Sequence, residues 1–193
     1  MRRPFSTTEP SGKRSHTTTT PFPENQSAAA LAQELSQLLA SPDPELRDEL
    51  AYSVLARWIA RPNILQPPEL RALADEWRAN PKSGIGESGT NSVLKRSFSA
   101  LCLSSIAERE VKTPFLSEQR YHQLLGDALT YLQSERDLRG YDAKLGWIHA
   151  TAHTADLLQA LASRPFAYER RAKQHSICTR GAPFFRTSGL HPR

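Results

Sequence analysis

Two histidines and an aspartate near the end of the chain have the spacing best suited to chemistry. His149, His153 and Asp156 follow one another at i, i+4 and i+7, so in a helix they would share one face. Two histidines one helical turn apart often bind a metal ion, because their side chains converge. The helical metalloprotease motif also needs a glutamate directly after its first histidine, and that position is Ala150. A metal site and a structural role in helix packing are therefore both open.

A second group of candidates could bind a ligand. The glycine-rich loop Gly84–Thr90 precedes a helical segment, where free backbone N–H groups can hold an anion. It lacks the ending of a phosphate-binding P-loop, and its Glu87 would repel a phosphate. Arg96, Arg139 and Tyr141 are the charged and aromatic residues that would join Glu87 in such a site. The alternative is structural: a capped turn, with each arginine paired to a carboxylate.

Common catalytic signatures do not occur in the sequence. It has no Gly-x-Ser-x-Gly elbow, no Cys-x-x-Cys, and no Gly-x-Gly-x-x-Gly that follows a predicted strand. The two cysteines, Cys102 and Cys178, form neither a disulfide framework nor a zinc-ligand spacing, and Cys102 is expected in the core. We therefore assign no catalytic residue and no cofactor.

Six segments with helical periodicity would position these residues. Ser27, Asp43 and Ser117 are the expected N-caps of three of them, and Pro44 suits a first helical turn. No segment alternates like a strand between hairpin turns, so the predicted class is all-α. The six predicted helices cover about residues 28–40, 44–61, 68–80, 91–110, 118–134 and 146–163. Leu46 and Leu50 are expected on the inward face of the second helix and Leu129 and Leu132 on that of the fifth, whereas the apolar residues of the fourth cover more than one face.

A short repeat indicates how these helices would pack. Ser53–Arg57 recurs as Ser92–Arg96, with four identities in five positions and a period of 39 residues. That period is close to the roughly 40 residues of HEAT-type repeats, although two apolar helices can also share such a pattern by chance. The predicted fold is a set of antiparallel helical hairpins stacked as a HEAT-like α–α superhelix.

Composition divides the chain into three parts. Residues 1–25 are rich in Ser, Thr and Pro and are predicted to be a disordered basic arm, whereas 26–165 form the helical domain and 166–193 an irregular basic tail. The chain has a net charge of +5, but its two ends are basic and its middle is net acidic, so nucleic-acid binding is expected only weakly, through those tails. No apolar run approaches the roughly 20 residues of a membrane helix and none suits a secretory signal, so we expect a cytoplasmic protein.

Five sequence blocks, in order, resemble a known family. They are residues 43–53, 84–87, 92–99, 137–141 and 146–158. The chain resembles, over about residues 27–165, the bacterial family of domain of unknown function 2785, which implies a helical fold and no assigned activity. Two features depart from the pattern. Asn91 stands where an aspartate is expected, and a basic tail, which could be a truncation or a shifted frame, replaces the further helices expected after Pro165.

Two functional hypotheses follow from these patterns. The favoured one is a non-catalytic interaction or scaffold module that binds a protein or peptide on its concave helical surface. The alternative is a small metal- or ligand-binding enzyme whose site lies around His149, His153 and Asp156, between the fourth and sixth helices. The second hypothesis requires those side chains to converge in one pocket.

Overall fold

The computed structural model describes residues 26–164, so the predicted arm (1–25) and tail (166–193) lie outside the described residues. The described part is mainly helical, with one small antiparallel sheet that the sequence did not predict. Its elements are α1 (Ala28–Leu38), the π-helix η1 (Glu45–Tyr52), α2 (Ser53–Ala60), α3 (Pro67–Ala79), the 3₁₀-helix η2 (Asn80–Lys82), α4 (Ser92–Lys112), α5 (Glu118–Ser134), β1 (Tyr141–Asp142), β2 (Gly146–Trp147) and α6 (Ala150–Ala162).

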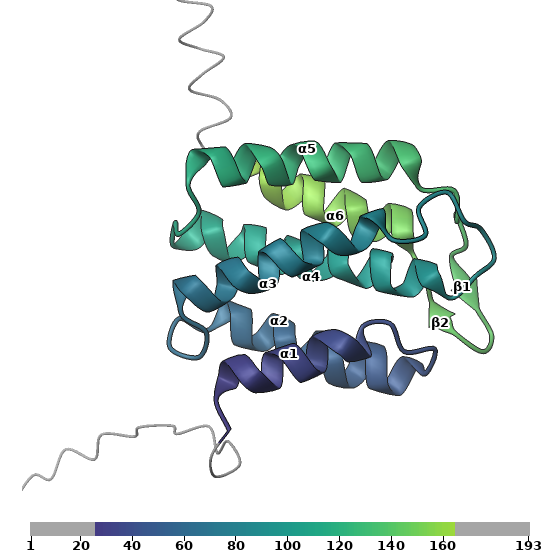
Figure 1. Ribbon diagram of the computed structural model, residues 1–193, viewed down its shortest axis with the longest axis horizontal. Coiled ribbons are helices and arrows are strands. Elements are labelled where there is room, and N and C mark those ends of the chain that lie inside the picture. Colours follow the sequence, from purple (N-terminus) through teal and green to yellow (C-terminus); the bar gives the residue numbers. More distant parts are fainter. Residues whose placement is uncertain (1–25, 165–193) are drawn as a thin grey trace, which may run out of the picture.

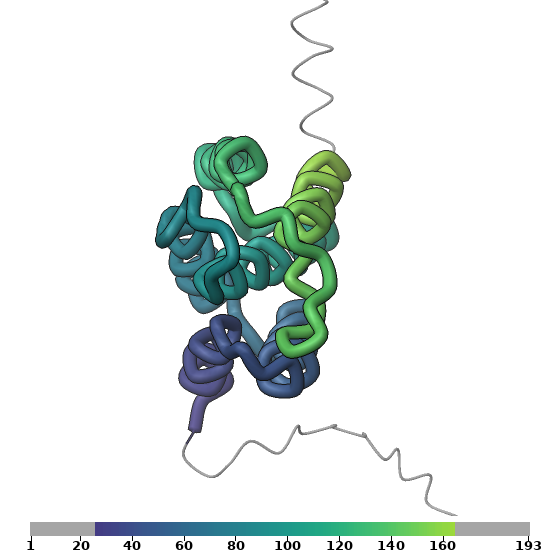
Figure 2. The backbone as a smooth tube through the Cα atoms, turned by 90° about the vertical axis from the view of Figure 1, so that its right-hand side faces the viewer, coloured from purple at the N-terminus to yellow at the C-terminus, as the bar shows by residue number. Residues whose placement is uncertain are grey.

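The helices form two layers. Helices α1, α3 and α5 lie one above another in the layer nearer the viewer of Figure 1, and α2, α4 and α6 lie behind them. Figure 2 shows the same arrangement from the side, with the two-stranded hairpin at the edge of the stack. We call the layer of α2, α4 and α6 the inner layer. No helix among residues 26–164 is both long and apolar enough to cross a membrane.

Helix α4 is the centre of the fold, as its apolar residues on several faces predicted. It packs on α2, α3 and α6, and its contact with α6 is the most extensive between any two elements. Leu94 and Ile106 have no exposed surface, and Phe98 has 2%. Cys102 is buried beside them, and this burial raises the pKa of its thiol. The prediction that Cys102 is a core residue is therefore confirmed.

Local sequence explains where several helices begin. The hydroxyl oxygen of Ser27 accepts a hydrogen bond from the Ala30 amide at 3.1 Å, and Ser117 caps α5 in the same way. At α3, the Glu69 carboxylate accepts a bond from the Gln66 amide at 2.6 Å, one step before Pro67 begins the helix. These caps account for the agreement between predicted and observed helix starts.

The predicted apolar face of the second helix is wrong in its first half. Leu46 and Leu50 were expected to point inward, yet they are 41% and 42% exposed, whereas Arg47 and Ala51 are fully buried. The physical reason is that this half is the π-helix η1, whose i→i+5 bonding adds a residue to each turn. The wider turn shifts which residues face inward, so Arg47 and Ala51 take the buried positions that the α-helical pattern had assigned to Leu46 and Leu50.

Two further predictions need correction. The sixth helix was expected to start at Gly146, but residues 146–147 form β2 and the helix starts at Ala150. On α5, Leu129 and Leu132 were expected to be inward, yet they are 45% and 40% exposed because the helix lies at the edge of the stack, where no described element covers its outer face.

The two copies of the predicted repeat lie in different environments. Arg96 of the second copy is fully buried in α4, while Arg57 of the first copy is exposed on α2. The apolar positions Leu55 and Leu94 are buried in both. The shared sequence thus corresponds to similar apolar packing, and its charged position serves different purposes in the two helices.

Candidate functional site

Arg96, one of the predicted ligand-binding residues, forms a buried ion pair. The Nε and Nη2 atoms of Arg96 donate hydrogen bonds of 2.7 and 3.0 Å to the two carboxylate oxygens of Glu135, which directly follows α5. Neither side chain is more than 4% exposed. This bidentate contact with the guanidinium helps to hold the pKa of Glu135 below its usual value, even though burial opposes ionisation. It ties α4 to the end of α5.

A second pair, next along the chain, holds the glycine-rich loop. Arg139 donates from Nε and Nη2 to the carboxylate of Asp137, at 2.9 and 2.6 Å, and from Nη2 to the carbonyl oxygen of Thr90 at 2.7 Å. The same carboxylate accepts the Gly89 amide at 2.9 Å. An anion is thus bound by the backbone of this loop, and that anion is the protein's own Asp137.

Glu87, like Asp137, accepts hydrogen bonds from groups of the protein itself. Its carboxylate accepts hydrogen bonds from the hydroxyls of Ser92 at 2.6 Å and Thr90 at 2.9 Å, and these bonds lower its pKa. Gly84, Gly86 and Gly89 have the spacing of a dinucleotide-binding loop, but the loop follows the 3₁₀-helix η2 and not a strand. Contacts within the protein therefore engage the polar groups of Glu87, Arg96 and Arg139, and a ligand-binding role for them stays a prediction.

An aromatic row marks the outer side of the hairpin. The Tyr141 and Trp147 rings, paired across β1 and β2, meet edge-on at 5.0 Å, and Trp147 stacks on His149 at 4.3 Å. His149 has φ +49°, in the left-handed region, and directly precedes α6. Tyr141 and Trp147 are 64% and 51% exposed. This row is held by the backbone turn at His149 and presents aromatic surface to solvent.

His153 lies behind this row in the core. Its Nδ1 atom is 2.8 Å from the hydroxyl of Ser97, and that hydroxyl donates its proton to the carbonyl oxygen of Ile148. Nδ1 must therefore carry the proton of the imidazole, so Ser97 is not poised to lose its proton to this histidine. Burial and the neighbouring His149 lower the pKa of His153 to about 4. The arrangement is that of a neutral structural histidine.

The structure separates the three residues predicted for metal binding. His149 lies outside the helix, so the i, i+4, i+7 argument does not apply to it. The rings of His149 and His153 are 5.9 Å apart, whereas Asp156 lines a different region, the inner layer. Residues 26–164 contain no group of three or more His, Cys, Asp or Glu side chains arranged to hold a metal ion.

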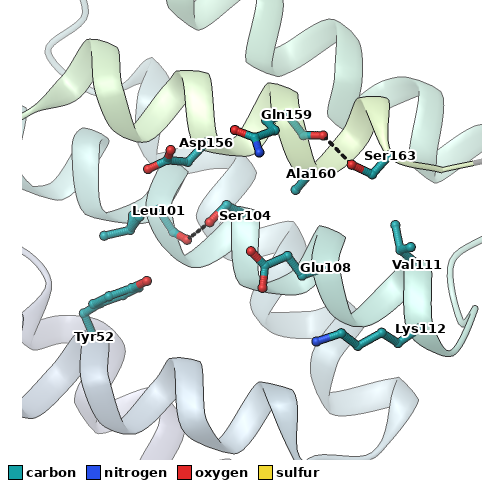
Figure 3. A pocket seen from close by; sticks show the side chains of 10 residues that line it. All are labelled: Tyr52, Leu101, Ser104, Glu108, Val111, Lys112, Asp156, Gln159, Ala160 and Ser163. Carbon is teal, nitrogen blue, oxygen red and sulfur yellow. Dashed lines mark hydrogen bonds between the residues drawn. The ribbon is translucent and has the colours of Figure 1, made fainter.

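The region around Asp156 is a groove across the inner layer. Figure 3 shows side chains from η1, α4 and α6 around one opening, which has a volume of about 330 Å³. We call this opening the inner groove. Its lining residues are Tyr52, Leu101, Ser104, Glu108, Val111, Lys112, Asp156, Gln159, Ala160 and Ser163.

A second hollow continues the inner groove toward α2. It has a volume of about 150 Å³ and shares Tyr52, Ser104, Glu108 and Lys112 with the groove. Ala56 and Ala60 of α2 form its far side, with Arg109 of α4. We call it the α2 hollow. Polar side chains line most of the two spaces, and short residues on α2 leave room between the helices.

Of the residues predicted for a site, Asp156 lines the inner groove. The sequence did not single out Tyr52, Glu108 or Lys112, although Ser104, Glu108 and Lys112 recur at i, i+4 and i+8 along the long central helix. That polar stripe along one face of the helix was the available signal. Tyr52 could not be found in this way, because its direction depends on the π-helix that it ends.

Comparison with known proteins gives one match. Residues 82–177 match the model of a family described as protein of unknown function (DUF2785). This match confirms the resemblance to the family and includes the four sequence blocks from residue 84 onward, whereas the block 43–53 lies outside it. No curated protein and no solved structure matches the chain. The matched range includes α4, α5 and α6, and so most of the residues that line the inner groove.

Proposed function

We propose, on the premise that residues 82–177 resemble the DUF2785 family, that this protein is a non-catalytic interaction module that binds a peptide segment of a partner protein. The observation that carries the proposal is the inner groove, because three segments of the chain, η1, α4 and α6, contribute to it. Stacked helical hairpins commonly bind extended peptides along the surface that their inner helices form. The inner layer would then be the concave face of a HEAT-like superhelix.

The chemistry of the lining supports a peptide as the occupant. Ser104, Gln159 and Ser163 offer hydroxyl and amide groups that can bond a peptide backbone, and Tyr52 adds an aromatic ring with a polar tip. The groove and the α2 hollow together form an open, elongated space, which suits an extended chain more than a compact metabolite.

The proposal is tested by selecting binders from a random 12-residue peptide library on the full chain, then measuring affinities by fluorescence anisotropy. Gln159→Trp would place a large ring in the groove from an exposed position of α6. We expect this variant to bind the selected peptides at least tenfold more weakly than wild type. Gln133→Trp, at an exposed position of α5 in the outer layer, is the matched control and should leave binding unchanged.

Two results would overturn this function. One is that the wild-type protein enriches no peptide from the library. The other is that the enriched peptides bind Gln159→Trp as tightly as wild type, which would place their site elsewhere on the molecule.

A further inference from the structure

We infer that the inner groove and the α2 hollow select a peptide with one basic and one acidic side chain, the basic one between Glu108 and Asp156 and the acidic one at Arg109 and Lys112. This inference rests on the proposed peptide-binding function. It adds the chemistry of the peptide's side chains and the order in which its basic and acidic side chains would lie, from Asp156 in the groove to Arg109 in the hollow.

The position proposed for the basic side chain of the peptide is lined by two carboxylates from different helices. Glu108 of α4 and Asp156 of α6 line the same opening, and Figure 3 shows them on either side of it, with the Tyr52 hydroxyl below. Among residues 26–164, neither carboxylate forms an ion pair or a side-chain hydrogen bond. A cationic side chain from a ligand would find two free carboxylates there, and the Tyr52 oxygen as an additional acceptor.

The buried carboxylates of the fold are different. Glu110 accepts hydrogen bonds from two backbone amides and pairs with Arg164, while Glu135 and Asp137 pair with arginines. The fold therefore satisfies the acidic groups that it buries for its own stability. The carboxylates of the groove are left to solvent or to a partner.

The surroundings of the Tyr52 hydroxyl indicate a negative electrostatic potential in the groove. Burial raises the pKa of its hydroxyl most, the neighbouring Cys102 raises it further, and the charges of Glu108 and Asp156 add to this in the same direction. A field that disfavours loss of a proton also favours a cation beside that oxygen. The two carboxylates that line the opening therefore also affect the ionisation of the Tyr52 hydroxyl.

The position proposed for the acidic side chain of the peptide is lined by Arg109 and Lys112, which form no ion pair among residues 26–164. Arg109 lines the α2 hollow, and its Nε atom is buried without a hydrogen-bond partner in the described part of the chain. Lys112 lines both spaces and forms no ion pair with Glu108, one turn away in the same helix. A ligand carboxylate in the hollow would pair with the Arg109 guanidinium and the Lys112 ammonium, which both line it. Glu108 and Lys112 line both spaces, whereas Asp156 lines only the groove and Arg109 only the hollow, so the combined space is more acidic at its Asp156 end and more basic at its Arg109 end.

The experiment compares two charge-neutralised variants in the same peptide selection. We expect wild type to enrich sequences with a basic and an acidic residue at a fixed separation. Glu108→Gln with Asp156→Asn should abolish the preference for the basic residue and keep that for the acidic one. Arg109→Gln with Lys112→Gln should do the reverse. Each pair should weaken a selected wild-type peptide at least tenfold.

A matched control and a rescue complete the design. Glu34→Gln with Glu49→Gln neutralises two exposed carboxylates outside the groove and should change neither preference. A peptide whose basic residue is replaced by glutamine should lose affinity for wild type but not for the Glu108/Asp156 variant. The circular dichroism melt of each variant shows that it is folded before selection.

The outcomes separate this inference from the function on which it rests. Peptides that compete for the groove but show no charge preference would overturn the inference and leave the peptide-binding function standing. A charge preference that persists in both neutralised variants would also overturn it. If the wild type enriches no peptide, the function and the inference fail together.

Discussion

At the scale of single residues, the Arg96–Glu135 pair is the contact whose loss should be most damaging. Both groups are buried, so removing one partner leaves an uncompensated charge in the core. We expect Arg96→Met to lower the free energy of unfolding by about 3–5 kcal/mol in urea denaturation. Arg57→Met, at the matching but exposed repeat position, should change it by less than about 0.5 kcal/mol.

A double variant shows how the loss arises. Removing both charges, with Arg96→Met and Glu135→Leu together, should cost less than the single arginine change, because no unpaired carboxylate is left. A double variant less stable than Arg96→Met would mean that Glu135 stabilises this corner without Arg96, through the hydrogen bonds that it accepts from the Arg136 and Asp137 amides.

His153 makes stability depend on pH. In the unfolded chain a histidine binds a proton below about pH 6.5, whereas the folded protein keeps His153 neutral down to about pH 4. The unfolded state therefore binds more protons in this window, and stability must fall as pH falls from 6.5 to 4. The contribution of His153 lost across the window is about 3 kcal/mol.

The measurement is urea denaturation at intervals from pH 7.5 to 4.5. His153→Gln should be less stable than wild type at pH 7.5, where the Ser97 contact is formed, and the difference should shrink toward pH 4.5. His122→Gln, on the exposed side of α5, is the control and should keep the wild-type slope. A His153→Gln slope equal to that of wild type would assign the acid sensitivity to other groups.

At the scale of elements, the hairpin depends on Gly146. This residue has φ +69°, and a Cβ atom there would lie 3.1 Å from the Cβ of Pro44, at the start of the second helical segment. We expect Gly146→Ala to cost about 1–2 kcal/mol, since the left-handed conformation disfavours a side chain. Gly140→Ala meets no atom within 4 Å and should be nearly neutral in the same chemical denaturation assay. Equal effects would contradict a close approach at Gly146.

The same elements show what could be predicted from the sequence. Helix starts with local causes, such as the Ser27 and Ser117 caps, were predicted because their signals lie within one turn. The hairpin was missed because distant groups hold it: Arg47 donates to the Leu145 carbonyl at 2.6 Å, and Ser97 to that of Ile148. A helix was therefore predicted through His149, where the backbone turns left-handed.

The site was predicted less well than the fold for a related reason. The sequence left both a ligand-binding and a structural role open for Arg96 and Arg139, and the structure shows both bonded to carboxylates of the protein, whose identity no spacing rule could give. The groove needs three helices placed side by side, and only Asp156 among its lining had been named. Sequence periodicity indicates which residues share one helix face, but not which faces meet across a stack.

At the scale of the whole molecule, the central position of α4 should decide how the protein opens. Phe98 of α4 contacts the rings of Tyr52 and His153 and the guanidinium of Arg47, so it joins the segments η1 and α6. Phe98→Ala should cost about 3–5 kcal/mol and speed amide hydrogen exchange in all inner helices. Leu39→Ala, equally buried but next to the terminal helix α1, is the matched comparison.

We expect Leu39→Ala to speed exchange mainly in α1 and η1 and to leave α5 and α6 protected. This difference follows if each helical hairpin is stabilised chiefly by the hairpins next to it, as in helical repeat proteins, so that a destabilising change at one end has little effect at the other. Hydrogen exchange with mass spectrometry can measure both variants on the same peptides. Uniform acceleration by Leu39→Ala would instead show that residues 26–164 unfold as one cooperative unit, in which no helix pair opens independently.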